Sequence, residues 1–125
     1  MLTKDVLRDY FDRLARRADW EALLGDKFQF TSYTSPVKEV VGKAPFLEAT
    51  KRFYSSIQSF EVRDLLVEGA RGCALTRYQL RSPNGTLFQS DVAELFTVRN
   101  AQIETLAIYF DTAPFPKADT TPSRA

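Results

Sequence analysis

Apolar residues recur at helical spacing in three segments of the first half of the chain. The first segment runs from about residue 4 to 17, and the third begins near Pro45. Between them, Asp19 is suited to cap a short second helix from Trp20 to Leu24. Side chains three and four positions apart share one helix face, so the first helix is predicted to bury a single stripe, which consists of Val6, Leu7, Tyr10, Phe11 and Leu14.

A two-residue alternation, typical of strands, replaces the helical spacing near Phe28 and again after Ser59. Helices followed by long antiparallel strands indicate an α+β fold. Strands this long must bend, so we expect three N-terminal helices packed against a strongly bent antiparallel sheet that encloses a pocket. The predicted strands are residues 28–34, 37–41, 60–67, 72–81, 86–98 and 101–111.

The Asn84-Gly85 dipeptide is a strong hairpin signal, and it sets which side chains share a face of the sheet. A two-residue loop would pair Pro83 with Thr86, and a four-residue loop would keep the same faces together, whereas a three-residue loop would exchange the faces of one strand relative to the other. Periodicity alone does not decide which face is the inner one. With the two-residue loop, Glu94 shares a face with Arg77, Gln79, Ser90 and Val92, and the opposite face carries Tyr78, Leu80, Asp91 and Ala93.

Composition narrows the possible functions. The chain has 125 residues and 44% hydrophobic residues, which suits one domain over residues 1–113 with a flexible Pro-rich tail over residues 114–125. A net charge of +1 predicts no nucleic-acid or membrane partner. The absence of histidine excludes Ser-His-Asp catalysis, and with a single cysteine it leaves no expected metal site or cofactor. Without a signal peptide or membrane-spanning run, we expect a cytoplasmic protein.

Three features carry a resemblance to a known family: Asp19-Trp20 after the first helix, Gly42-Lys43 before the third, and the C-terminal stretches Ser90–Val98 and Ile108–Asp111. Over roughly residues 3 to 115 the chain resembles the SnoaL-like branch of the NTF2-like superfamily, which includes ketosteroid isomerases, limonene epoxide hydrolases and polyketide cyclases. The resemblance implies a cone with one small-molecule pocket. It also implies a homodimer formed through the outer sheet face, for which the candidates are Tyr78, Leu80, Ala93 and Leu95.

The same resemblance implies roles for individual residues. Tyr10 and Glu94 stand where ketosteroid isomerases place the tyrosine and the protonated aspartate of their oxyanion hole, which implies that Glu94 projects into a cavity beneath the first helix. The general base of that family would fall between Ser32 and Ser35, where this sequence has no carboxylate. Arg77 matches the pocket arginine of limonene epoxide hydrolases, but Gln79 and Ile108 replace the two aspartates of that family.

Several interpretations stay open at this point. Tyr10 is either a core residue or a hydrogen-bond donor to substrate. Glu94 is a structural partner of Arg77, a proton donor or acceptor, or a solvated side chain; Trp20 is packing or a stacking platform. The protein is either an isomerase- or cyclase-type acid–base enzyme acting on an apolar oxygenated metabolite, or a non-catalytic ligand-binding or dimerisation module. The predicted ligand-contacting residues are Trp20, Phe30, Ser32, Thr34, Gln79, Ser90, Val92 and Phe110.

Overall fold

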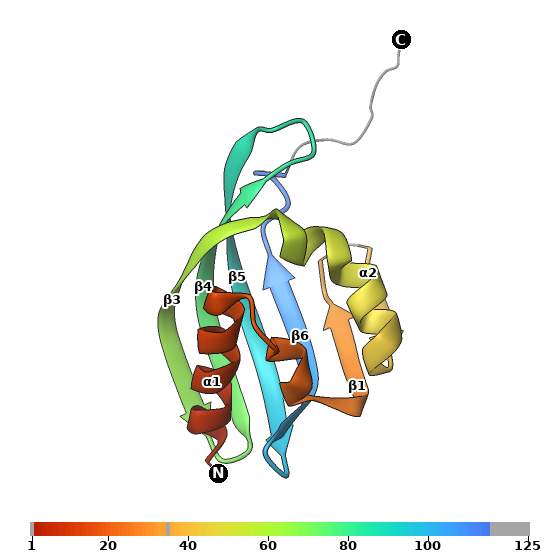
Figure 1. Ribbon diagram of the computed structural model, residues 1–125, viewed down its shortest axis with the longest axis vertical. Helices are drawn as coiled ribbons and strands as arrows, with labels where there is room; N and C mark the ends of the chain where they lie inside the picture. Colours follow the sequence, from red (N-terminus) through yellow and green to blue (C-terminus); the bar gives the residue numbers. More distant parts are fainter. Residues whose placement is uncertain (1, 35, 116–125) are drawn as a thin grey trace.

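The computed structural model describes residues 2–34 and 36–115. Within these residues, two α-helices lie on one face of a curved six-stranded sheet (Figure 1). Helix α1 (Thr3–Arg16) lies over the half of the sheet formed by β3 (Ile57–Glu68), β4 (Arg71–Arg81) and β5 (Leu87–Arg99). Helix α2 (Lys43–Ser56) lies over the other half, above β1 (Leu24–Ser32). No helix formed by the described residues lies on the opposite face of the sheet.

The predicted apolar stripe of α1 is confirmed. Val6, Leu7, Tyr10, Phe11 and Leu14 are all buried, and they form the main core together with side chains from the sheet. The exposed side of the helix carries two salt bridges, and the two partners of each lie four residues apart, which is about one helical turn.

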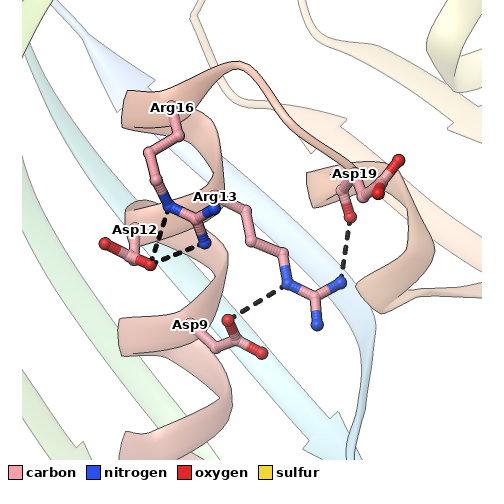
Figure 2. A network of polar contacts seen from close by, with 5 residues as sticks. All are labelled: Asp9, Asp12, Arg13, Arg16 and Asp19. Atoms are coloured by element: carbon pink, nitrogen blue, oxygen red, sulfur yellow. Dashed lines mark hydrogen bonds and ion pairs between the residues drawn. The ribbon is translucent and has the colours of Figure 1, made fainter.

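Polar contacts join the exposed side of α1 to the segment that follows it (Figure 2). Arg13 pairs with Asp9, and its guanidinium also donates to the backbone oxygen of Asp19. Arg16 pairs with Asp12. The Arg13 contacts hold the end of α1 against the next segment.

The prediction of three α-helices is wrong, because the segment after α1 is only the short 3-10 helix η1 (Trp20–Leu23). Asp19 precedes η1 in a left-handed conformation with a φ of 57°, and its side chain makes no capping hydrogen bond. Strand β1 already begins at Leu24. The first four N–H groups and the last four C=O groups of any α-helix lack partners within the helix, so a segment this short could make almost no α-helical hydrogen bonds.

The sheet is mixed, not antiparallel as predicted. Its strand order is β2-β1-β6-β5-β4-β3, with β2 (Lys38–Val41) and β3 at the edges and β6 (Gln102–Phe110) in the middle. After β2, helix α2 carries the chain to the far edge, and the β3–β6 meander then returns to β1. Strand β6 therefore arrives beside β1 running in the same direction, and the two strands pair in parallel.

Curvature of the sheet was predicted, and register shifts in three of its strand pairs accompany it. Irregularities interrupt the pairing of β3 with β4, of β5 with β6 and of β1 with β6. Such irregularities bend a strand and increase its local twist. The long strands β3, β4 and β5 can therefore curl around the helices.

Of the loop lengths left open for the β4–β5 hairpin, the structure has the three-residue loop, so the face assignment made with a two-residue loop is wrong. Arg81 pairs with Leu87, and the backbone of Ser82 bonds to that of Thr86, so the loop has three residues with Gly85 at a φ of 89°. This odd loop exchanges the faces of β4 relative to β5. The inner face is consequently formed by Ala74, Thr76, Tyr78 and Leu80 of β4 and by Ser90, Val92, Glu94 and Phe96 of β5.

The predicted tail begins at Pro114, and most of it lies outside the described residues. Phe115 is described, and its ring packs against those of Phe88 and Phe110. Within the described part of the chain, no helix has the length and apolar character needed to cross a membrane.

Candidate functional site

A cavity of about 300 Å³ lies between α2 and the inner face of the sheet. Its volume is at the lower end of the ~300–1,000 Å³ that small-molecule sites occupy. The cavity was expected beneath the first helix, but it lies beneath α2. Aromatic and aliphatic side chains dominate its lining, which consists of Phe30, Ser32, Lys38, Phe46, Ala49, Thr50, Phe53, Tyr54, Tyr78, Ser90, Val92, Glu94, Leu106, Ile108, Phe110 and Phe115.

Glu94 projects into this cavity from the middle of β5, and its side chain is buried. The Tyr78 hydroxyl donates a hydrogen bond of 2.9 Å to Oε2 of the carboxyl group. The other oxygen, Oε1, is buried and has no hydrogen-bond partner among the described residues. A buried carboxyl oxygen without a partner is rare in proteins, and the residue that carries this one lines the cavity.

Burial raises the pKa of Glu94 from 4.5 to about 7. The hydroxyls of Thr76 and Tyr78 favour the charged form and oppose this rise, although Thr76 lies outside hydrogen-bonding geometry. No guanidinium or ammonium group pairs with Glu94 in the described part of the chain. Desolvation is therefore the dominant effect on the pKa of Glu94. A carboxyl group with a pKa of about 7 can gain or lose a proton near neutral pH.

Two tyrosines form a second polar contact close to Glu94. The hydroxyl of Tyr10 on α1 lies 3.0 Å from that of Tyr54 on α2. Tyr10 is buried in the core and does not line the cavity, whereas Tyr54 does. Burial, reinforced by neighbouring charges including that of Glu94, raises the pKa of Tyr10, and burial likewise raises the pKa of Tyr54. Both phenols are therefore neutral hydrogen-bond donors at physiological pH.

The structure places Arg77 and Gln79 on the outer face of the sheet, away from the cavity. Arg77 pairs across the strands with Asp91 through two hydrogen bonds of 2.8 and 3.2 Å, and Gln79 bonds to Gln89. The predicted pairing of Arg77 with Glu94 is thus wrong. The three-residue hairpin loop is the physical reason, because it turns the odd-numbered side chains of β4 outward.

Five of the predicted ligand-contacting residues line the cavity. They are Phe30, Ser32, Ser90, Val92 and Phe110. Thr34 lies just beyond β1, where its hydroxyl bonds to the backbone of Phe110. Ring stacking places Trp20 on Tyr54, with centroids 4.2 Å apart.

A larger cleft of about 700 Å³ lies on the other side of Tyr54, between the end of α1, η1 and α2. Trp20 lines this cleft, and its rim carries charged residues such as Arg17 and Lys51. We assign the site to the smaller cavity because Glu94 and Ser90, which each carry a buried oxygen without a partner, line it.

The sequence did not indicate that two tyrosines, Tyr78 and Tyr54, line the cavity together with Glu94. Tyr78 was expected on the outer face, and it would have been placed correctly only with the three-residue loop. Tyr54 belongs to the apolar stripe of α2, where nothing in the sequence separates a cavity-lining phenol from a core one. No group of three or more His, Cys, Asp or Glu residues within the described ranges is arranged to hold a metal ion.

Two helices packed on one face of a curved mixed sheet, with a cavity between them, define an NTF2-like α+β fold. Solved structures share this fold. An NTF2-like protein of unknown function from Cytophaga hutchinsonii aligns with a TM-score of 0.69 and 18% identity over 91% of this chain and 94% of its own. A candidate SnoaL-like polyketide cyclase from a Jannaschia species aligns with a TM-score of 0.75 and 16% identity, covering 92% and 93% of the two chains.

A candidate ketosteroid isomerase from Kribbella flavida is also similar, with a TM-score of 0.70 and 20% identity over 97% of this chain and 82% of its own. The model of the SnoaL-like domain matches residues 7–105, so the chain belongs to the SnoaL-like domain family. No curated protein matches it.

Proposed function

We propose that the protein is an acid–base enzyme of the isomerase or cyclase type, acting on a small, largely apolar molecule that carries a carbonyl group. One observation carries the proposal: Glu94 is buried at the cavity wall with one free oxygen and a pKa raised to about 7. A carboxyl group with this pKa can act as a base and then as an acid within one reaction cycle.

In the proposed reaction, Oε1 of Glu94 removes a proton from the carbon next to the carbonyl group of the substrate. The bond between Tyr78 and Oε2 holds the carboxyl group in place. In a substrate with a double bond between its β and γ carbons, the electrons move onto the carbonyl oxygen and form a dienolate. The protonated Glu94 then returns the proton to the γ carbon, and the double bond shifts to the position between the α and β carbons. The atoms balance without a second base, which removes the need for a carboxylate between Ser32 and Ser35.

The enolate oxygen requires a hydrogen-bond donor, and Tyr54 is the best-placed group. Its side chain lines the same cavity as Glu94, and its hydroxyl is hydrogen-bonded to that of Tyr10. If Tyr10 donates to Tyr54, the Tyr54 proton is free to point at the substrate. Tyr10 then acts as a positioning residue behind Tyr54, and a preorganised donor of this kind stabilises a developing oxyanion.

Hydrogen–deuterium exchange tests the proposal without knowledge of the natural substrate. A panel of straight-chain and cyclic apolar ketones would be incubated with the protein in D₂O, and loss of the α-proton signal would be followed by NMR. We expect enzyme-dependent exchange, a decrease of about 10²–10⁴-fold in Glu94→Gln, and a smaller decrease in Tyr54→Phe.

Glu68→Gln is the matched control, because Glu68 is an exposed glutamate at the end of β3. This variant should exchange protons like the wild type. Ketones that bind without any exchange above the rate in buffer would refute the catalytic proposal and support the non-catalytic ligand-binding module.

We further propose that the open face of the sheet pairs with a second copy of this chain. Large apolar side chains lie exposed there. Leu75, at 41% exposure, and Tyr109, at 50%, lie in one row across the strands, because both residues pair with Ala93. Tyr109 stacks on Tyr33, which extends the apolar area. Exposed apolar side chains that gather on one face can mark a protein–protein interaction site. Of the residues predicted for this interface, Ala93 belongs to the same row, whereas Tyr78 and Leu80 are buried on the inner face.

A further inference from the structure

Ser90 is a second polar group in the cavity that the proposed reaction does not use. Its side chain is fully buried at 0% exposure, lines the cavity, and its hydroxyl has no hydrogen-bond partner among the described residues. More than ~90% of buried polar groups in proteins have a partner. A buried, unpartnered hydroxyl on a residue that lines a cavity is therefore suited to bind a polar atom of a ligand.

The separation of Ser90 and Glu94 along β5 sets the length of a ligand that can contact both residues. Both residues are on β5, four positions apart, and both face the cavity. Four residues of a strand span ~13 Å at a rise of ~3.3 Å each.

The surface between these two groups is apolar. Val92 lies between them on the same strand, and Phe110 of β6 pairs with Val92 across the strands. A ligand that touches both polar groups must therefore have a hydrocarbon segment in its middle. The cavity volume of about 300 Å³ leaves room for one extended chain or a small ring system.

We infer that Ser90 binds a second oxygen of the substrate, so that the substrate is an elongated apolar molecule with a carbonyl group at one end and a hydroxyl or second carbonyl group toward the other. This inference rests on the proposed function only for the carbonyl end. Ser90 is then a specificity-determining residue, which selects substrates by length and by the position of the second oxygen.

The test measures binding, by calorimetry, for methyl ketones of about six to ten carbon atoms, because ~13 Å corresponds to roughly ten zigzag bonds of ~1.5 Å. Each ketone would be compared with the analogue that carries a hydroxyl group on its last carbon. In the wild type we expect the hydroxyl group to strengthen binding about threefold to tenfold at one chain length, the range of a single net hydrogen bond. In Ser90→Ala this preference should disappear.

Two further variants keep the result interpretable. Thr76→Val removes another buried, unpartnered hydroxyl, one that does not line the cavity, and it should leave the preference unchanged. Ser90→Cys keeps the shape of the side chain with a weaker donor and should show an intermediate preference. Ser90→Ala should fold with undiminished stability, because it deletes a polar group that has no internal partner.

Failure of this inference is distinguishable from failure of the proposed function. If only the reaction is wrong, no ketone exchanges its protons, but the hydroxyl preference and its loss in Ser90→Ala persist. If only the Ser90 assignment is wrong, simple ketones exchange in a Glu94-dependent manner, while no chain length shows a preference. A preference that survives Ser90→Ala would also overturn the assignment.

Discussion

Replacing Glu94 by glutamine should change how the stability of the protein depends on pH. Glutamine has nearly the same shape, and its amide oxygen can still accept the hydrogen bond from Tyr78. It cannot ionise. The variant therefore removes the titration of one buried group and leaves the packing of the cavity wall in place.

The magnitude follows from the raised pKa. The folded protein binds the proton of Glu94 with a pKa of about 7, against 4.5 for the unshifted group. Between these values the folded state holds a proton that the unfolded state has lost, so stability falls as pH rises from 4.5 to about 7 and is level above that. A difference of this size corresponds to about 3 kcal/mol.

Denaturant unfolding between pH 4.5 and pH 8 measures this effect. The stability of Glu94→Gln minus that of the wild type should rise by about 3 kcal/mol across this range, because the variant lacks the penalty of a buried carboxylate. Taking the difference cancels the titration of all other groups. Glu68→Gln controls for the loss of one negative charge. The reasoning would be refuted if this difference in stability changed by less than about 1 kcal/mol between pH 4.5 and pH 8, or if it fell as the pH rose.

Four other outcomes are expected. The rate of ketone exchange should rise with pH and level off above about 7, since Glu94 must be ionised to act as the base; a rate that falls over this range would contradict that role. Arg77→Ala should leave exchange and the pKa of Glu94 unchanged, because Arg77 pairs with Asp91 on the outer face. Gly72→Ala should lower the free energy of unfolding by about 1–3 kcal/mol, because the added Cβ would overlap the buried Leu7 side chain. Leu75→Glu should convert a dimer into a monomer in analytical ultracentrifugation, and a wild type that is monomeric at high concentration would refute the proposed interface.

The helices and strands could be predicted from the sequence because each of them buries one face. The apolar spacing in α1 located all five of its buried residues, and the alternation in β5 placed that strand within a residue of its observed ends. These patterns are local, so they do not depend on how the elements come together. The helical segment at Trp20 failed because four residues are too few for periodicity to separate a 3-10 turn from an α-helix.

The site was harder to predict because its geometry depends on non-local pairing. The parallel contact between β1 and β6 joins segments more than 70 residues apart, and no local pattern encodes it. The inward direction of Glu94 came from family resemblance alone. Pairing with Arg77 was one of the alternatives for Glu94, whereas the three-residue loop brings Tyr78 to the carboxyl group instead.

The central claim is that Glu94 sits in a desolvated cavity and exchanges its proton near neutral pH. An NMR titration of the protein with ¹³C-labelled glutamate side chains, assigned through Glu94→Gln, measures this directly. We predict one glutamate carboxyl signal, absent in the variant, that titrates at a pKa of about 7. A Glu94 signal that titrates at the ordinary glutamate value of about 4.3 would contradict the account.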